Sequence, residues 1–531
     1  MKTKTHTLVN GVAFLAAAGI VVKVLGLICK IPLVHVIGED GMGYFNSAYT
    51  IYNLFFMLSN AGLPVAISIL ISEQNAKGNA FGIRSVFRTV FRAVCLVGII
   101  GCVILLVLAE ELACFVGNPE AGACIAVMAP VFLFVCIAGG LRGYYQGLSR
   151  LVPTGISQLI EAIVKTVLGV GLAVYAVRKG YPLSICAAFS LMGIAFGSLL
   201  SMLYLLILSF LNGAFAAVER SVISGKRRED AVLKRLFKIA LPVTLGSLVV
   251  SLSNFLDLTV VMRGLRSVGM SAEMANRLYG NYTGLAVPLF NLPPVLIMPI
   301  AYATVPSITE ARMKNDTQKI AQISAGALKA VSLITLPCVF GLFLLSRPVL
   351  LILFEKEAAL RAAPLLSLLA PAVFFVGIVT VTGSMLQGCG KPIAPVLSML
   401  CGAAVKLVLS FVLIPTQGIV GAPIGTLVCY VVIAGVNLVF CMRYCHLQTR
   451  LFTQFWLPLA AAFGSALSGR LVYHGLCCAL SVRLAAMISV IWVAAIYFAL
   501  LIIFRTLDRN ELEALPIPTK IKELMQKCVP T

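Results

Sequence analysis

Four lysines lie inside stretches of sequence that are otherwise apolar enough to cross a membrane: Lys23, Lys30, Lys165 and Lys406. A lysine ammonium in the hydrocarbon core of a bilayer costs about 3 kcal/mol or more. Such a residue is therefore expected to face a water-filled cavity, a counter-ion or an anionic ligand. Because lysine binds anions as a point charge, the four together predict recognition of an acidic group within the membrane.

The four lysines differ in the local partners that the sequence offers. Lys23 lies about 20 Å of helical rise from either end of its apolar stretch, too far for its side chain to reach an interface readily. Lys30 lies about 9 Å from the outer end, so snorkelling to the interface is an alternative to ligand binding. Lys165 follows Glu161 at a spacing of four, so a structural ion pair is the alternative for that residue. Lys406 has no acid at the same spacing.

Asp257 is the one further acid within a predicted span, in the outer half of its helix. Lys30 lies in the outer half of the first helix, at a similar depth. We expect these two side chains to approach each other and close an outer gate, with a coupling-ion site as the alternative role of Asp257.

An aromatic stripe follows the first lysine-bearing helix. Phe45, Tyr49, Tyr52 and Phe56 recur at spacings of four, three and four, with Asn53 beside them. Sugar rings dock on aromatic faces, while hydroxyl and amide groups bind sugar hydroxyls. The stripe therefore predicts contacts to a glycan, and packing between helices is the alternative.

The stretch around Asn291 is rich in proline: Pro288, Pro293, Pro294 and Pro299. A proline removes a backbone donor and bends a helix. Broken membrane helices often line transport sites. We therefore expect a moving element that presents Asn291 to a substrate, with a static kink as the alternative.

The composition indicates that the helices carrying these residues lie in a membrane. Of the 531 residues, 60% are hydrophobic and 11% are charged, whereas soluble domains carry about 25% charged residues. The net charge of +21 would suit nucleic acid, but soluble basic domains are not this apolar, so no nucleic acid is expected. An all-α polytopic membrane protein with fourteen spans is predicted. The spans are 8–36, 45–72, 86–108, 121–145, 153–177, 183–211, 239–262, 278–307, 321–345, 362–387, 392–415, 418–441, 452–473 and 482–504.

The basic residues predict the orientation. Most of them fall in cytoplasmic segments if both termini are cytoplasmic, which obeys the positive-inside rule. Arg263, Arg266 and Arg277 lie on the outer side and are exceptions. The first apolar stretch continues through Lys23 and Lys30, so we expect a retained helix and not a cleaved signal peptide.

The chain also repeats itself. "QGLSRLVPTGISQLIEAIVK" at 146–165 aligns with "QGCGKPIAPVLSMLCGAAVK" at 387–406, and "LISE" at 70–73 has a counterpart in "SITE" at 307–310. Two parallel six-helix lobes are predicted, because an even number of helices returns the chain to the same side. The predicted parts are an N-terminal lobe 1–215, a basic cytoplasmic linker 216–238, a C-terminal lobe 239–445, two extra helices in 446–506 and a cytoplasmic tail 507–531.

Several segments resemble one family: "LGLICKIPLVHVIGEDGMGYF", "NAGLPVAISILISE", "LRGYYQGLSRLVPTGISQLIEAIVK" and "YGNYTGLAVPLFNLPPVLIMPIAYATVPSITE". They are similar to the polysaccharide-flippase branch of the multidrug/oligosaccharidyl-lipid/polysaccharide exporter superfamily. Within it they most resemble the stage V sporulation protein B group, related to MurJ-type lipid II flippases. The resemblance covers nearly the whole chain, and the LRG-aromatic-aromatic-QG stretch is its most specific part.

The resemblance implies a V-shaped, MATE-like transporter of the bacterial cell membrane with a cavity between two lobes. It implies transport of an undecaprenyl-pyrophosphate-linked sugar from the inner to the outer leaflet. A diphosphate would match the surplus lysines, so the expected substrate-binding residues are Lys23, Lys30, Lys406, Tyr49, Tyr52, Asn53 and Asn291. Glu161 and Lys165 are expected to form a gating or structural pair. MurJ-type proteins carry arginines on the first helix where this chain has Lys23 and Lys30, so lipid II is not assured as the substrate.

The absence of several motifs excludes some classes of enzyme and transporter. The sequence has no phosphate-binding G-x-x-x-x-G-K-[ST] loop, no H-E-x-x-H and no C-x-x-C pair. We therefore expect no enzyme, no cofactor and no metal, with a membrane potential or an ion gradient (Na⁺ or H⁺) as the driving force. The expected protein is a monomer whose partners are the bilayer and a lipid-linked glycan. The alternatives are a cation-coupled multidrug exporter, which would favour more intramembrane acids, and a membrane glycosyl- or phosphotransferase.

Overall fold

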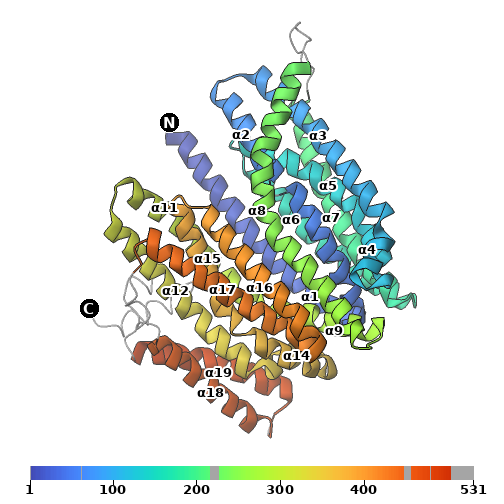
Figure 1. Ribbon diagram of the computed structural model, residues 1–531, viewed down its shortest axis with the longest axis vertical. Coiled ribbons are helices and arrows are strands. Elements are labelled where there is room, and N and C mark those ends of the chain that lie inside the picture. The colour runs from blue at the N-terminus through green and yellow to red at the C-terminus, as the bar shows by residue number, and fades with distance from the viewer. Residues whose placement is uncertain (1, 61, 216–225, 448–455, 479, 504–531) are drawn as a thin grey trace. The chain divides into compact units, whose positions relative to one another are not determined.

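The computed structural model describes residues 2–60, 62–215, 226–447, 456–478 and 480–503 (Figure 1). The secondary structure of these residues consists of helices joined by turns, without a strand. The predicted all-α class is therefore confirmed. The chain forms two compact units, Met1–Gly280 and Asn281–Thr531.

The helices of the first unit begin with a long N-terminal element. They are α1 (Lys2–Asn60), α2 (Gly62–Ala76), α3 (Ala80–Val107), α4 (Ala109–Val116), the 3₁₀ turn η1 (Pro119–Ala121), α5 (Gly122–Gly147), α6 (Val152–Arg178), α7 (Leu183–Leu211), α8 (Lys226–Ser267) and α9 (Ala272–Asn281). The element α1 holds the predicted span 8–36 and the first part of the span 45–72, which continues in α2, and Gly38 lies between the two spans. Its φ of 65° and ψ of −170° are open to glycine, which has no Cβ.

The helices of the second unit begin with a π-helical turn. They are η2 (Tyr282–Ala286), α10 (Val287–Phe290), α11 (Leu292–Met313), α12 (Thr317–Leu344), α13 (Ser346–Leu353), α14 (Lys356–Leu369), α15 (Ala372–Gly388), α16 (Ile393–Gln417), the 3₁₀ turn η3 (Gly418–Val420), α17 (Gly421–Tyr444), α18 (Trp456–Leu476) and α19 (Val482–Ile503). The proline-rich helix is thus interrupted at Asn291, between α10 and α11. The predicted break is confirmed, and its movement stays a prediction.

The membrane-crossing helices follow the predicted spans. Nine helical segments of the described residues are long and apolar enough to cross a membrane, or ten if the bent pair α14–α15 is one span. Two of the nine, Ala17–Ala76 and Ile393–Tyr444, each contain two predicted spans. The helix α8 covers the predicted span 239–262, and α18 covers the predicted span 452–473 from Trp456 on, the residues before it lying outside the described ones. Neither helix is among these segments.

The internal repeat is visible in the turns between helices. Ser149 and Gly390, 241 positions apart, both adopt a left-handed conformation, with φ of 60° and 71°. Gly78 and Asn315, 237 positions apart, do the same, with φ of 63° and 53°. The two offsets are those of the repeated sequences, so equivalent turns end equivalent helices. The helices α8 and α9 belong to the first compact unit. The lobe boundaries at 215 and 239 stay a prediction.

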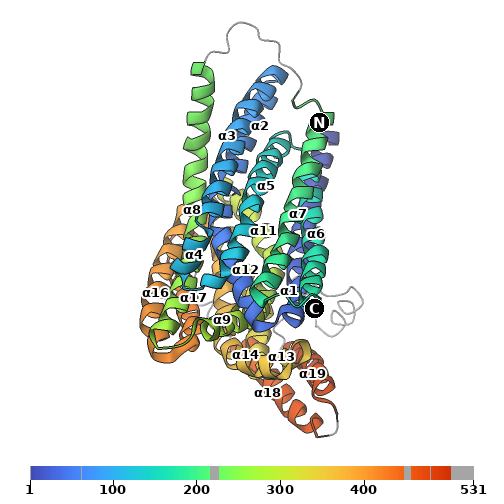
Figure 2. The same ribbon diagram turned by 90° about the vertical axis from the view of Figure 1, so that its right-hand side faces the viewer.

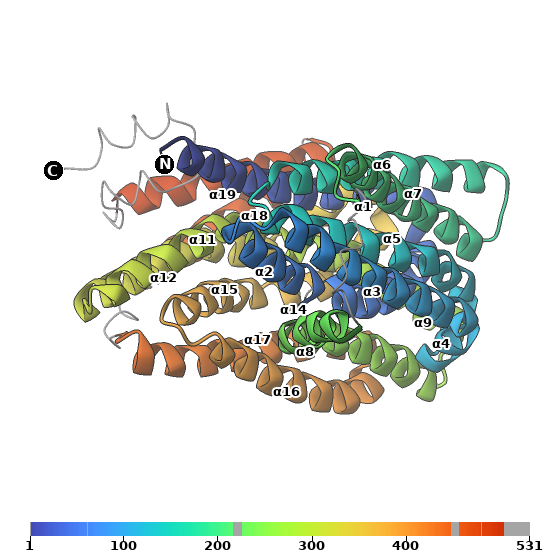
Figure 3. The ribbon, with the colours of Figure 1, turned by 90° about the horizontal axis from the view of Figure 1, so that it is seen from above.

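Small residues allow the helices of each unit to approach closely. In the first unit α1, α6 and α7 lie side by side (Figure 3). A Cβ added to Gly193 on α7 would meet the backbone of Gly169 on α6, so glycine sets this spacing. In the second unit α18 and α19 pack on α12 and α13 (Figure 2). There the hydroxyl of Tyr497 donates to the carbonyl oxygen of Leu333 at 2.9 Å.

Candidate functional site

The predicted aromatic stripe forms a continuous run of ring contacts on the second half of α1. Successive ring centroids lie 6.0, 6.1 and 5.7 Å apart from Phe45 through Tyr49 and Tyr52 to Phe56. The ammonium of Lys165 on α6 lies 5.3 Å from the centroid of the Tyr49 ring. This distance is within the range of a cation–π interaction. The stripe therefore joins an aromatic surface to an intramembrane cation.

A second lysine lies close to this contact. Lys30, on the first half of α1, is within electrostatic range of Lys165, and Cys29 lies near both. Lys30, Lys165 and Tyr49 are half-buried, whereas Tyr52 is buried. Two ammonium groups that repel each other in a half-buried site favour an anion between them. We call Lys30, Lys165 and Tyr49 the lysine site.

Glu161 belongs to a different cluster, which sequence analysis did not identify. Its carboxylate accepts a hydrogen bond from the guanidinium of Arg142 on α5 at 2.8 Å. Arg142 is 7% exposed, and it also donates to the hydroxyls of Ser157 and Ser201 at 3.0 Å each. The hydroxyl of Ser198 donates to Glu161 at 3.4 Å. These contacts connect α5, α6 and α7 through one satisfied ion pair.

Glu161 forms an ion pair with Arg142, while Lys165 is also within electrostatic range of Glu161. The predicted pair of Glu161 with Lys165 therefore stays a prediction. Residues four apart share a helical face, but the partner that satisfies Glu161 comes from a neighbouring helix. The internal repeat carries a signal for this contact. At the offset of 241, Arg142 corresponds to Gly383 and Glu161 to Gly402. Both charges are missing together from the second copy, as expected of two residues that need each other.

The remaining predicted residues occupy varied surroundings. Lys23 is exposed on α1, and Asn53 and Asp257 are half-buried. In the second unit, Asn291 is exposed at the break before α11, and Lys406 on α16 is 8% exposed. Substrate contacts at these positions stay predictions. Within the described ranges, no group of three histidine, cysteine or acidic side chains could hold a metal ion.

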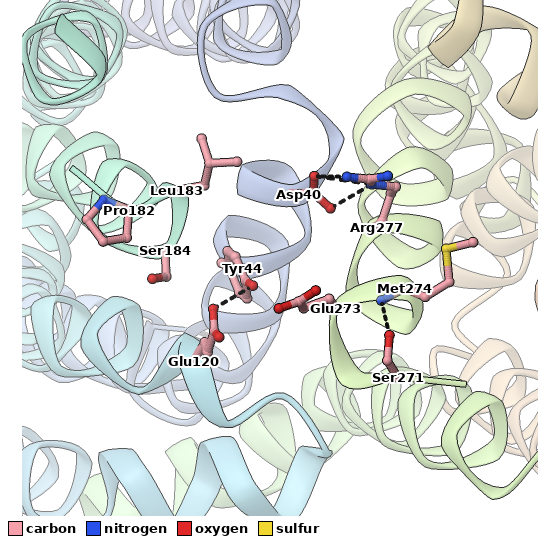
Figure 4. Close-up of a pocket in the computed structure, with 10 residues that line it drawn as sticks. All are labelled: Asp40, Tyr44, Glu120, Pro182, Leu183, Ser184, Ser271, Glu273, Met274 and Arg277. Atoms are coloured by element: carbon pink, nitrogen blue, oxygen red, sulfur yellow. Dashed lines mark hydrogen bonds and ion pairs between the residues drawn. The ribbon is translucent and has the colours of Figure 1, made fainter. Parts of the chain in front are cut away.

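The end of the first unit that is predicted to be the outer one holds a polar pocket of about 370 Å³. Figure 4 shows Asp40 and Tyr44 of α1 facing Arg277 of α9 and Glu120 of η1. The guanidinium of Arg277 donates to both carboxylate oxygens of Asp40, with distances of 2.8 to 3.2 Å. These bonds raise the pKa of Arg277, so its charge persists at every physiological pH. The hydroxyl of Tyr44 donates to Glu120 at 2.7 Å.

A chain of amides lies beside this pocket. The amide of Asn118 donates to the side-chain oxygen of Asn276 at 2.8 Å, and Asn276 donates to the Asp40 carbonyl at 2.8 Å. The backbones approach so closely that a Cβ at Gly280 would meet the carbonyl of Glu39. We call the Asp40–Arg277 ion pair, these amide bonds and the Gly280 contact the outer latch.

The other two outer arginines also have specific partners. Arg263 of α8 donates to the carbonyl of Phe115 at 2.6 Å. Its guanidinium also lies 4.5 Å from the centroid of the Phe115 ring. Arg266 donates to the carbonyl of Gly117 at 3.4 Å. These carbonyls lie at the C-terminal end of α4, where a helix attracts cations. The three exceptions to the positive-inside rule therefore fix α8 and α9 against α1 and α4.

The predicted Lys30–Asp257 gate stays a prediction. Among the described residues, the structure shows an Asp40–Arg277 ion pair at the predicted outer end of the first unit.

The outer latch makes a testable prediction. The Asp40–Arg277 pair is partly exposed, so Arg277→Gln should accelerate hydrogen–deuterium exchange of α9 modestly, by up to about fivefold. Gly280→Ala should have a larger effect, because the added methyl group collides with backbone. Lys314→Gln removes an exposed ion pair with Glu310 in the second unit and is the control. Equal exchange of α9 in all three variants would show that the latch does not hold this helix.

Comparison with known proteins identifies the family. A family model described as polysaccharide biosynthesis protein matches residues 8–312. The chain belongs to the polysaccharide biosynthesis protein family. Stage V sporulation protein B of Bacillus subtilis (strain 168) is 25% identical to this chain over 518 residues, covering 96% of this chain and 98% of that protein. Lipid II flippase MurJ of the same organism is 24% identical over 446 residues, covering 80% of each chain.

Solved structures show that this member of the family has a transporter fold. The chain matches the lipid II flippase MurJ in an inward closed conformation with a TM-score of 0.70 and 14% identity, covering 92% of this chain and 98% of that one. It also matches an inward-facing multidrug resistance MATE family transporter with a TM-score of 0.62 and 17% identity, covering 80% and 99%. The predicted MATE-like fold of a multi-pass membrane protein is confirmed.

Proposed function

We propose that this chain is a flippase that moves an undecaprenyl-pyrophosphate-linked sugar from the inner to the outer leaflet of a bacterial membrane. The lysine site is the observation that carries the proposal. It combines two half-buried ammonium groups with an aromatic stripe, which suits a diphosphate joined to a glycan. The named relatives, a sporulation protein and a lipid II flippase, favour a cell-wall precursor, with lipid II as one candidate.

The Arg142–Glu161 pair argues against the multidrug-exporter alternative. An exporter of cationic drugs needs an intramembrane carboxylate that is available to a cation. Glu161 already receives the Arg142 guanidinium, while Lys30 and Lys165 would repel a cationic ligand. The charges of the lysine site and this cluster therefore fit an anionic substrate better than a cationic one.

The outer latch fits a transport cycle of alternating access. With the latch formed, α8 and α9 are held against the outer ends of α1 and α4, which would keep the outer exit shut while substrate enters from the cytoplasm. Opening would break the Asp40–Arg277 pair and the amide bonds together. A membrane potential or an ion gradient would drive the cycle, since each charge moved across 100 mV is worth about 2.3 kcal/mol.

A binding measurement on the purified full-length protein separates the two functions. Undecaprenyl pyrophosphate should raise the thermal unfolding midpoint, because a ligand that binds the folded state stabilises it by mass action. Undecaprenyl monophosphate should raise it less, and a cationic dye such as ethidium should not raise it. Stabilisation by ethidium without stabilisation by the pyrophosphate lipid would contradict the flippase proposal and favour a multidrug exporter.

A further inference from the structure

The helix α8 is longer than a membrane crossing requires. It has 42 residues, which rise about 63 Å, whereas about 20 residues span the apolar core. The predicted apolar span begins at 239, so residues 226–238 extend the helix by about 20 Å beyond the membrane core. This extension is basic: it contains Lys226, Arg227, Arg228, Lys234, Arg235 and Lys238 against Glu229 and Asp230.

One face of α8 packs against α2, in the extension and just beyond it. A Cβ at Gly62 would meet the carbonyl of Ala240 and the hydroxyl of Thr244, so the two helices are in close contact there. Arg235 donates to Glu73, near the end of α2, at 2.6 Å. This face of α8 is therefore covered by α2, and Arg235 already has an acidic partner there.

A different face is exposed and combines charge with apolar surface. Lys234, Phe237, Lys238 and Leu241 follow one another at spacings of three, one and three, and all four are exposed. Phe237 is 48% and Leu241 57% exposed. Lys238 adjoins the predicted apolar span, and Lys234 lies one turn, about 6 Å, farther out. That separation matches the thickness of the headgroup layer, about 5 to 7 Å on each side of a bilayer.

We propose that Lys234, Phe237, Lys238 and Leu241 form a binding site for the headgroup of an anionic phospholipid such as phosphatidylglycerol. The two ammonium groups would bind the lipid phosphate, while the ring of Phe237 lies against the headgroup boundary between them and the side chain of Leu241 contacts the acyl chains. The apolar pair favours a lipid over a free phosphate ion, which would gain nothing from these contacts. The site is separate from the lysine site and does not depend on the transported glycan.

Lipid binding to the full-length protein in neutral detergent tests this proposal. Phosphatidylglycerol should remain bound in native mass spectrometry in preference to phosphatidylcholine. The variant Lys234→Gln/Lys238→Gln should bind it about 30-fold more weakly, from about fivefold for each lysine near a charged surface. The variant Lys77→Gln/Lys319→Gln removes the same charge from two exposed lysines elsewhere in the chain, and it should bind phosphatidylglycerol normally.

A second variant tests the apolar contacts with the charges intact. Phe237→Ser/Leu241→Ser should also weaken phosphatidylglycerol binding, because the acyl boundary loses its contacts. Equal losses in the two lysine variants would overturn the proposal, since net charge would then explain binding. An unchanged affinity in the serine variant would overturn it as well. Displacement of phosphatidylglycerol by an equal concentration of inorganic pyrophosphate would identify a phosphate site in place of a lipid site.

Discussion

Replacing Lys165 by glutamine should abolish stabilisation by undecaprenyl pyrophosphate and leave the empty protein nearly as stable as before. A charged hydrogen bond to phosphate contributes enough for the affinity to fall about 10- to 100-fold. The empty protein should lose little stability, because relief of the repulsion between Lys165 and Lys30 offsets the lost contact with the Tyr49 ring. A lysine with a purely structural role would behave oppositely, and its loss would lower the unfolding midpoint of the empty protein.

The same helix offers a matched control for this experiment. The ammonium of Lys179 lies 5.9 Å from the ring centroid of Tyr175, which repeats the lysine-over-tyrosine geometry near the end of α6. Lys179 is exposed and far along the helix from the lysine site. Lys179→Gln should therefore leave binding of the pyrophosphate lipid unchanged. Equal losses of binding in the two variants would contradict the lysine site.

Breaking the Arg142–Glu161 pair should have the largest effect on stability. Removing one partner of a buried ion pair costs about 3 to 5 kcal/mol, because the other charge stays buried without compensation. We expect Glu161→Leu, which leaves the buried Arg142 guanidinium unpaired, to reduce the free energy of unfolding by an amount in this range. Arg142→Met should reduce it less, because the Glu161 side chain is 23% exposed. The measurement is denaturant unfolding of the purified protein in detergent, together with its accumulation in membranes.

The double variant separates the contribution of the ion pair from the contributions of the two individual residues. Arg142→Met/Glu161→Leu should recover most of the lost stability, since apolar residues can replace a buried pair at little cost. Lys314→Gln breaks an exposed pair in the second unit and should leave unfolding unchanged. If Arg142→Met is no more harmful than Lys314→Gln, the cluster does not hold α5, α6 and α7 together.

Much of the fold could be predicted from the sequence because a bilayer imposes simple rules. Long apolar stretches must become helices, since no water satisfies the backbone within the hydrocarbon core. The repeated turns at Ser149 and Gly390 appear in the sequence as a constant offset. The aromatic stripe of α1 was also predictable, because a helical spacing places its four rings on one face.

The contacts that the sequence analysis missed join residues that are distant in sequence. Arg142 lies near the end of a predicted span, and its carboxylate partner is on the next helix, so no i, i+4 pattern reveals the pair. The outer arginines were exceptions to a charge rule, because their partners are backbone carbonyls and Asp40. The short helix α4, whose end binds Arg263 and Arg266, falls between two predicted spans. Local periodicity does not report such tertiary contacts.

Reconstitution in liposomes tests the central claim most directly. A fluorescent undecaprenyl-pyrophosphate-linked sugar would be placed in both leaflets, and a membrane-impermeant reagent would quench the outer pool. The proposed function predicts that vesicles with the wild-type chain and an imposed membrane potential lose the protected inner pool over time. Vesicles with Lys165→Gln should retain it, and those with Lys179→Gln should behave as wild type. Retention of the inner pool by the wild-type protein, with ethidium transported under the same conditions, would contradict the assignment as a lipid-linked glycan flippase.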